Sequence, residues 1–180
     1  MHCACHITGQ SGDAAHMLRF VRAPDGDYVA DLADKLPDPA VYVLPRASVV
    51  KKLGGAGLAG QVGAQLRTRA LAQLGMARKA GKLVLGFSKT EAALNAGQLH
   101  LLLAAHDGAA HGKKALAAKA RALDVAICAV FGRDELGMAL GRANVIHAGA
   151  TDAVWAARLQ QHALQVEAYA AADADRRDEV

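Results

Sequence analysis

The chain has 180 residues, of which 53% are hydrophobic and only 4% aromatic, and its formal net charge is +4. The longest apolar stretch, around residues 101–105, is much shorter than the roughly 20 residues of a membrane span, so we expect no membrane helix. The first residues contain neither a basic leader nor a long apolar core, so we expect a cytoplasmic protein. Ala, Leu and Val must fill the core, which favours helices packed on a small sheet.

Cysteine and histidine gather at the N-terminus as His2, Cys3, Cys5 and His6, and a further cysteine is Cys128. Thiolate and imidazole are preferred ligands of zinc. One short run of residues cannot easily surround a tetrahedral ion, however, and the sequence has no later Cys-x-x-Cys pair. We therefore expect no metal site, no cofactor and no disulfide framework.

Residues 1–53 predict a small α/β module. Residues 17–22 alternate apolar and polar, residues 24–27 have turn chemistry, and residues 28–32 can return as the partner strand of a hairpin. A third extended run covers residues 41–44, after which Ser48 can cap a short helix that ends near Leu53.

Residues 54–65 are rich in glycine, and we interpret them as a flexible linker. Gly55, Gly57 and Gly60 match the Gly-x-Gly-x-x-Gly pattern of dinucleotide sites. That pattern requires a preceding strand and an acidic residue about 20 positions later. The preceding segment here looks helical and the next acid is Glu91, so a nucleotide site is the weaker interpretation.

Residues 66–170 alternate between helix and strand patterns. Helices are predicted over residues 66–81, 88–97, 109–122, 133–140 and 151–170, and strands over residues 83–85, 99–105, 125–130 and 145–147. Ser88 with Glu91 three residues later predicts a capping box for the second of these helices. This order predicts the α/β class, as a three-layer α/β/α sandwich with a mostly parallel or mixed sheet. Residues 171–180 are predicted to be a disordered tail.

Positive charge is concentrated in one part of the chain. Between Pro39 and Thr90 there is no Asp or Glu. The basic residues in that stretch are Arg46, Lys51, Lys52, Arg67, Arg69, Arg78, Lys79, Lys82 and Lys89. Segregated positive charge is typical of surfaces that bind phosphate backbones, although a solvated basic segment would have the same composition.

Catalytic groups are sparse. The sequence has no evident pairing of a nucleophile with a base, and no evident pair of catalytic carboxylates. His106 and Asp107, at the predicted end of a strand, come nearest to a site. A solvent-facing histidine is the simpler interpretation, so we expect a protein that is not an enzyme.

Residues 74–87 (LGMARKAGKLVLGF) and 130–141 (VFGRDELGMALG) resemble the bacterial, YlxQ-type branch of the ribosomal L-seven-Ae family of kink-turn RNA binders. The resemblance covers residues 66–165 and implies an α/β/α sandwich with a four-stranded mixed sheet. It also implies an RNA surface made from the turn at 86–89 and the loop at 130–133. The RNA-binding residues predicted on this basis are Arg78, Lys79, Lys82, Gly86, Phe87, Ser88, Lys89, Lys113, Val130, Phe131, Gly132 and Arg133.

The sequence departs from the kink-turn readers of this family at three positions. Those proteins carry Asn-Glu after the glycine and Lys three residues further on, where this chain has Ser88, Lys89 and Ala92. A lysine cannot accept a hydrogen bond from the amino edge of guanine, so recognition of the RNA backbone and shape is expected. Phe131 could stack on an extruded base or pack in the core.

Residues 5–43 resemble the YlxR family, through the runs CHITG, LRFV, PDG, KLP and YV. The resemblance implies nucleic-acid binding linked to transcription, translation and RNA processing, including the RNase P ribozyme. The Gly-Arg-Gly signature of that family is replaced here by Asp38-Pro39-Ala40. A possible second nucleic-acid surface consists of Arg19, Arg22, Lys35, Arg46, Lys51 and Lys52.

The sequence therefore predicts a non-enzymatic binder of structured RNA, such as rRNA, RNase P RNA or another folded RNA, that acts near ribosome assembly, translation or RNase P. Two alternatives stay open. One is an adaptor that binds a ribonucleoprotein or RNA polymerase, and the other is a DNA-binding regulator.

Overall fold

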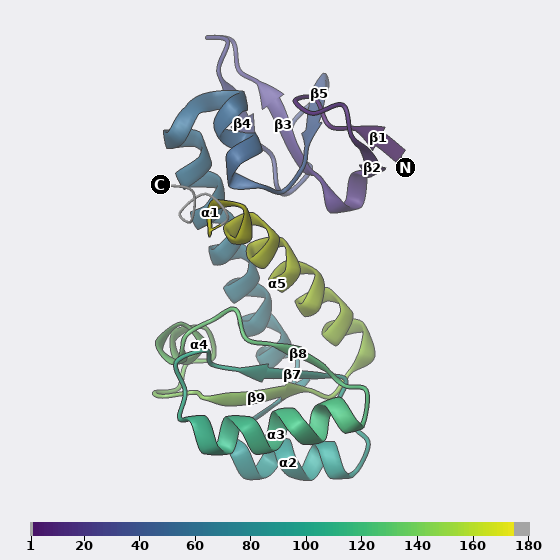
Figure 1. The fold of residues 1–180 in the computed structure, drawn as a ribbon, viewed down its shortest axis with the longest axis vertical. Coiled ribbons are helices and arrows are strands. Elements are labelled where there is room, and N and C mark those ends of the chain that lie inside the picture. Colours follow the sequence, from purple (N-terminus) through teal and green to yellow (C-terminus); the bar gives the residue numbers. More distant parts are fainter. Residues whose placement is uncertain (1, 175–180) are drawn as a thin grey trace. The chain divides into compact units, whose positions relative to one another are not determined.

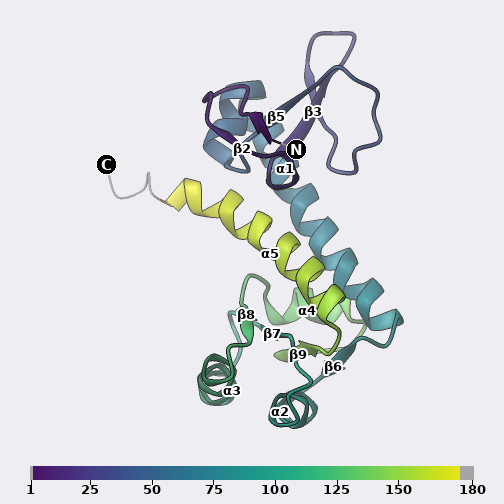
Figure 2. The same cartoon turned by 90° about the vertical axis from the view of Figure 1, so that its right-hand side faces the viewer.

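The computed structural model describes residues 2–174, with the side chains of residues 110, 111, 113 and 172–174 left out. It divides into two compact units, shown in Figures 1 and 2. Met1–Arg67 and Gln165–Val180 form what we call the N-terminal unit, and Thr68–Leu164 form the sandwich unit. Along the described residues, we find no helix with the length and apolar character of a membrane span.

The N-terminal unit contains two small antiparallel sheets and the first part of a long helix. Its elements are β1 (His2–Ala4), β2 (Ser11–Asp13), the 3₁₀ helix η1 (Ala14–His16), β3 (Leu18–Arg22), β4 (Tyr28–Ala30), β5 (Ala40–Val43) and the beginning of α1 (Ala47–Lys79). β1 pairs with β2, and β3 lies between β4 and β5. The hairpin and the third strand predicted from the alternating pattern are confirmed. Leu18, Phe20 and Val43 are buried because they share the inner face of this sheet.

The predicted linker over residues 54–65 is wrong, because most of it is helical. Non-helical backbone occurs at Gly54 and Gly55, where α1 bends, and the helix continues from residue 56. Ala59, Val62 and Leu66 are buried and recur at helical spacing, so this segment packs through one face. That packing offsets the conformational cost of glycine in a helix.

The sandwich unit contains a four-stranded mixed sheet with the strand order β6-β9-β7-β8. Its elements are the end of α1, β6 (Leu83–Leu85), α2 (Phe87–Asn95), β7 (Leu101–Ala104), α3 (Ala110–Ala122), β8 (Ala126–Cys128), α4 (Arg133–Ala139), β9 (His147–Ala150) and the beginning of α5 (Ala153–Ala174). α2 and α3 cover one face of the sheet, and α1 and α5 reach the other (Figures 1 and 2). The predicted α/β sandwich is confirmed.

The core of the sandwich unit forms around β7. All four residues of this strand are buried, as expected for a strand covered on both faces. Leu102 packs with Leu94, Leu99, Leu116 and Ala120, which come from α2, its following turn and α3. Burial of these aliphatic side chains contributes roughly 1.5–3 kcal/mol each, so they account for much of the stability of the unit.

The last strand differs from its prediction. The β-branched pair Val145 and Ile146 favoured a strand over residues 145–147, but β9 covers His147–Ala150. Its small residues have low strand propensity. They form a strand because β9 pairs antiparallel with both β6 and β7. Position 149 requires glycine, since a Cβ there would lie 2.1 Å from a side-chain carbon of Leu99.

Two helix ends also differ from their predictions. α2 begins at Phe87 with Gly86 at its N-cap, so Ser88 is not the cap. The predicted partner Glu91 instead accepts a hydrogen bond from Lys119 of α3, at 3.0 Å. α5 continues to residue 174, so residues 171–174 are helical where a disordered tail was predicted. Residues 175–180 of that predicted tail lie outside the described residues.

Candidate nucleic-acid interface

Four connecting segments meet at one edge of the sandwich sheet. β6, β7 and β8 run in the same direction, because β6 and β7 both pair antiparallel with β9 and because β8 pairs parallel with β7. The segments that follow these three strands and the segment that precedes β9 therefore lie at one edge, which we call the carboxyl edge. They are residues 86–89, 105–109, 129–132 and 141–146. The two predicted parts of the RNA surface, at 86–89 and 130–133, are thus brought to the same edge.

The turn from β6 into α2 is open to solvent. Phe87, Ser88 and Lys89 are exposed. For the aromatic residue Phe87 the exposed fraction is 38%. Gly86 has a φ of +90°, which residues with a side chain rarely adopt. Gly86 has no side chain that could accept hydrogen bonds from the first N–H groups of α2. These N–H groups and the positive end of the helix dipole are therefore suited to a phosphate.

Phe87 lies beside a depression at the carboxyl edge. Its ring contacts the ring of His147 edge-to-face, with 5.8 Å between the centroids. The backbone N–H of Gly86 donates to the carbonyl of His147 at 2.8 Å, so the turn is fixed to β9. The depression has a volume of about 360 Å³ and is lined by residues 85–87 and 142–147. Arg142 and Asn144 are exposed on its rim. An exposed aromatic ring, a cation and an amide around one hollow could hold a nucleobase.

The loop from β8 into α4 is closed by its own side chains. Phe131 is only 3% exposed. Its ring therefore packs in the core and is not available to stack on a base. The N–H of Gly132 donates to Glu135 Oε2 at 2.9 Å, and the N–H of Arg133 donates to Asp107 Oδ1 at 2.8 Å. Because the N–H groups of Gly132 and Arg133 already donate to carboxylates, this loop has fewer free donors for a phosphate than the β6–α2 turn has.

Arg133 is exposed but lies close to negative charge. Its Nε atom is 3.9 Å from Asp107 Oδ2 and 3.8 Å from Asp134 Oδ1. The hydrogen bond from the Arg133 N–H lowers the pKa of Asp107 below its ordinary value, so this carboxylate stays ionised near neutral pH. The guanidinium charge is therefore partly neutralised within the protein.

The sandwich unit also resembles known proteins. Residues 68–154 match the model of the Ribosomal protein L7Ae/L30e/S12e/Gadd45 family. We call these residues the L7Ae-type region. The match confirms the resemblance of this region to the L-seven-Ae family, whereas the YlxQ-type branch and kink-turn recognition stay predictions. The YlxR resemblance of residues 5–43 stays a prediction.

Two solved structures are similar to part of this chain. One similar structure is a protein of unknown function from Bacillus halodurans, with 29% sequence identity and a TM-score of 0.51, covering 52% of this chain and 95% of that chain. Another is the Giardia lamblia 15.5kD RNA binding protein, with 18% identity and a TM-score of 0.47, covering 58% of this chain and 89% of that chain. No curated protein matches this chain.

The remaining predicted residues of the L7Ae-type region are distributed over different surfaces. Arg78 is exposed near the carboxyl edge, since its Nη1 atom lies 2.9 Å from the position of a Cβ on Gly141. Lys79 is exposed in the last turn of α1. Lys82 precedes β6, at the opposite edge of the sheet, and its Nζ atom is 3.2 Å from Asp152 Oδ2. The prediction that Lys82 belongs to the RNA surface is therefore not supported by its position.

Val130 and Lys113 are the last two predicted residues of this region. Val130 is half-buried within the closed β8–α4 loop. Lys113 lies in the first turns of α3, next to the carboxyl edge, but its side chain lies outside the described residues.

Arg19 was predicted to lie on a nucleic-acid surface of the N-terminal unit, but the structure buries it in a group of ion pairs. It is only 8% exposed and forms ion pairs with Asp31, Asp34 and Asp38. A guanidinium surrounded by three carboxylates is not available to RNA, so its assignment to a nucleic-acid surface is wrong. Alternation along β3 places Arg19 on the face opposite Leu18 and Phe20, so the signal available in the sequence was the group of acids that follows at Asp31, Asp34 and Asp38.

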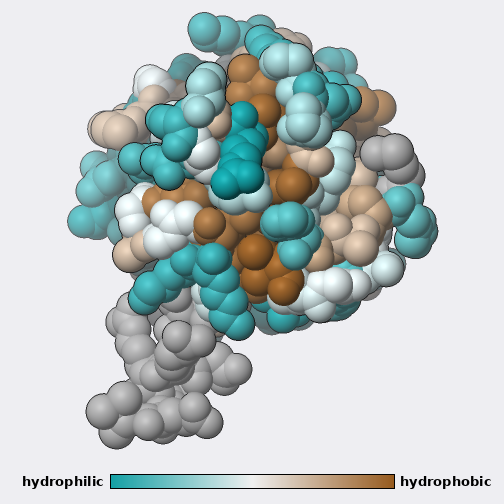
Figure 3. Space-filling model, turned by 90° about the horizontal axis from the view of Figure 1, so that it is seen from above, coloured by the Kyte–Doolittle hydropathy of each residue, from teal (hydrophilic) through white to brown (hydrophobic). Residues whose placement is uncertain are grey.

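The other cations of that set stay exposed. Arg22 donates from Nε to the carbonyl of Gly26 at 3.0 Å and lies over the Tyr28 ring. The remaining exposed residues are Lys35, Arg46, Lys51 and Lys52. In the molecular face shown in Figure 3, hydrophobic side chains are interspersed with hydrophilic ones, so that face does not form one continuous hydrophilic band.

The N-terminal cysteines are held by protein groups. Across the part of the chain that the structure describes, His, Cys, Asp and Glu side chains form no group of three that could hold a metal ion. Cys5 is buried, and its Sγ atom accepts a hydrogen bond from the N–H of Leu44 at 3.4 Å. Burial alone would raise the pKa of the Cys5 thiol, but hydrogen bonds from Thr8, Leu44 and Ile7 outweigh it and lower the pKa.

Arg142 and Asn144 were missed by the sequence analysis. Asn144 has a φ of +53°, and Gly141 has a φ of +55°, so the segment turns sharply before β9. The sequence signal for this turn was present, because Gly and Asn tolerate that conformation. Nothing in the sequence alone placed the turn beside Phe87.

Proposed function

We propose that the L7Ae-type region binds structured RNA through the carboxyl edge of its sheet. The observation that carries this proposal is the exposed Phe87 beside a depression rimmed by Arg142 and Asn144, at the open N-terminus of α2. The family match supports RNA binding in general. We call Phe87, Ser88, Lys89, Arg142 and Asn144 the RNA face.

The RNA face combines three kinds of contact. The first N–H groups of α2 and the Lys89 ammonium would bind one phosphate, and Arg142 would bind a neighbouring one. Phe87 would stack on a base that enters the depression. Lys89 can donate but not accept hydrogen bonds, so the region would recognise the backbone and the shape of a folded RNA more than its base sequence. No chemical step is required of the protein, which makes it a non-enzymatic binder.

The cellular setting that we propose is ribosome assembly, translation or RNase P. The YlxR resemblance of the N-terminal unit supports this setting, since that family implies a link to the same machinery. The unit could act there as an adaptor for a ribonucleoprotein or RNA polymerase, because Arg19 is occupied by carboxylates and Asp38 stands within the segment that replaces the Gly-Arg-Gly signature.

RNA binding is tested by titrating a folded RNA into the full chain at several salt concentrations. We expect Lys89→Glu and Arg142→Glu to weaken binding and to reduce the salt slope by about 1 each. Arg133→Glu should have a smaller effect, because Asp107 and Asp134 already neutralise part of its charge. Arg158→Glu is the matched control, since this exposed cation lies on α5, which starts at the opposite edge of the sheet.

Three outcomes would decide between the candidate functions. Equal affinity of Lys89→Glu, Arg142→Glu and the wild type would refute the RNA face. Binding of duplex DNA at least as tight as that of RNA at matched salt would favour a DNA-binding regulator. For the adaptor, protein partners should stay bound in a pull-down after nuclease treatment, and their loss with the RNA would contradict it.

A further inference from the structure

β8 is an edge of the sandwich sheet. In the described strand order, β8 has β7 on one side and no strand on the other. Val125, Ala126 and Ile127 are only half-buried, whereas every residue of β7 is buried. In the strand order of the described residues, β8 is therefore an edge strand, beside which a further strand could be added.

The sequence of β8 lacks the features that usually prevent edge strands from pairing. Proteins commonly protect such strands with lysine, proline, a bulge or a covering element. Residues 125–130 read VAICAV and contain no charged residue, no proline and no glycine. Leu123, just before the strand, is 52% exposed, so apolar surface extends beyond the strand itself.

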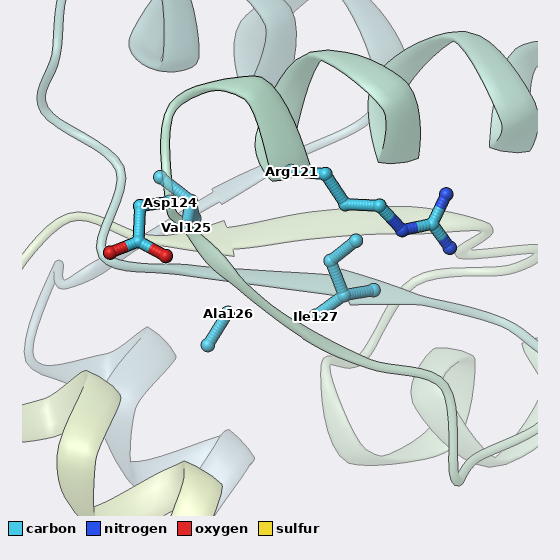
Figure 4. Close-up of a pocket in the computed structure, with 5 residues that line it drawn as sticks. All are labelled: Arg121, Asp124, Val125, Ala126 and Ile127. Carbon is cyan, nitrogen blue, oxygen red and sulfur yellow. The ribbon is translucent and has the colours of Figure 1, made fainter.

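A groove with two opposite charges runs along this edge. It has a volume of about 510 Å³ and is lined by Arg121, Asp124, Val125, Ala126 and Ile127. Figure 4 shows the carboxylate of Asp124 at one end of the groove and the guanidinium of Arg121 at the other, with Ala126 and Ile127 between them. The two charges are thus separated along the direction of the strand.

This arrangement is complementary to itself. A two-fold axis that passes beside the centre of β8, perpendicular to the sheet, would place the opposite ends of the two grooves next to each other. The Asp124 of a second copy would then approach Arg121, and its Arg121 would approach Asp124. The same rotation would place the two β8 strands antiparallel, which is the orientation in which edge strands pair readily.

We infer that β8 is a self-association surface, at which a second copy of this chain pairs antiparallel to form one sheet across two molecules. Each dimer would contain two ion pairs between Arg121 and Asp124. A strand of three residues buries less than the roughly 1,600 Å² of a standard interface, so the dimer should be weak, with a Kd in the micromolar range or above.

Sedimentation of the full chain over a wide range of micromolar concentrations tests this inference. We expect Arg121→Glu and Asp124→Lys each to weaken self-association at least about tenfold, because each variant places like charges opposite one another. An equimolar mixture of the two variants should associate as the wild type does, since every facing pair is then opposite in charge. Lys114→Glu, an exposed change on the same helix α3, is the control that should leave association unchanged.

Asp124 has a φ of +55°, so its replacement by lysine can strain the turn. Asp124→Asn removes the charge but tolerates this conformation, and it should weaken association less than Asp124→Lys does. Circular dichroism of each variant establishes that it is folded. A wild type that stays monomeric at all concentrations would overturn the inference. Single variants that associate like the wild type, or a mixture that associates no better than its components, would overturn it as well.

Discussion

Arg19 and Asp31 form a buried ion pair inside the N-terminal unit, with 9% and 4% of their side chains exposed. Asp31 also accepts hydrogen bonds from the N–H groups of Lys35 and Leu36, at 3.0 and 2.9 Å. Arg19 donates to Asp38 at 3.0 Å. The pair therefore ties β3 to the segment of residues 31–38, which contains no regular element.

Removing this pair should destabilise the N-terminal unit. Arg19→Met leaves the Asp31 carboxylate buried without its cation, so we expect the melting temperature to fall by several degrees. Asp31→Asn should cost less, because Arg19 keeps Asp34 and Asp38 as partners. Thermal unfolding followed by circular dichroism measures both. Arg22→Met, on the exposed part of the same strand, is the control, and an equal effect of Arg22→Met and Arg19→Met would contradict the role of the pair.

The stability should fall in acid through Asp31. Burial would raise the pKa of this carboxyl, but the N–H donors of Lys35 and Leu36 and the charge of Arg19 outweigh it and lower the pKa below the ordinary 3.8. A carboxyl with a lowered pKa in the folded state stabilises the fold above its ordinary pKa, and this contribution is lost as the pH falls through the folded-state value. We expect the wild type to lose its stability advantage over Asp31→Asn progressively as the pH falls below about 4. A difference that stays constant as the solution is acidified would contradict the assignment.

Phe87 and Phe131 should separate binding from stability. Phe87→Ala is expected to weaken RNA binding by about 1–3 kcal/mol if one base stacks on the ring, with little change in unfolding free energy. Phe131→Ala removes a side chain that is 3% exposed, so it should cost about 3–5 kcal/mol of stability. Chemical denaturation and RNA titration of the two variants measure the contrast. If Phe87→Ala bound RNA normally while Phe131→Ala, still folded, lost binding, the depression beside Phe87 would not be the base site.

Two glycines of α1 test whether residues 56–65 are a helix. Gly57 and Gly60 are exposed, and a Cβ at either position would meet no atom within 4 Å. Alanine there should increase the helical signal and stabilise the protein by about 0.5–1 kcal/mol per site. Gly55→Ala should have the opposite effect, because Gly55 has a φ of +80°. An unchanged helical signal in the Gly57→Ala/Gly60→Ala variant would indicate that this segment is a flexible linker after all.

Much of the fold could be predicted from the sequence, because its elements have strong local patterns. The apolar run at 101–105 and the helix stop at Gly97 lie where they were expected. The failures have a common cause, which is that tertiary contacts outweighed local propensity. Gly63 in the supposed linker lies against Tyr169, whose ring would be 3.2 Å from a Cβ at that position. That contact involves residues about a hundred positions apart, which no local pattern reveals.

The candidate site was predictable only in part. The exposed turn at Phe87 and Lys89 followed from the resemblance and from the glycine before it. The burial of Phe131 and the carboxylates around Arg133 did not, because they depend on how the β7–α3 loop meets the β8–α4 loop. Positive charge in the sequence likewise did not distinguish the exposed Lys89 from the buried Arg19.

The sequence by itself determined the α/β class, the order of most helices and strands, and the basic character of residues 39–90, because composition and periodicity are local properties. Only the tertiary structure decided which charges are available. It enclosed Arg19 among three aspartates, paired Lys82 with Asp152, and placed Arg142 beside Phe87. A charge acts through its distance from other charges and from water, and those distances exist only once the strands have paired.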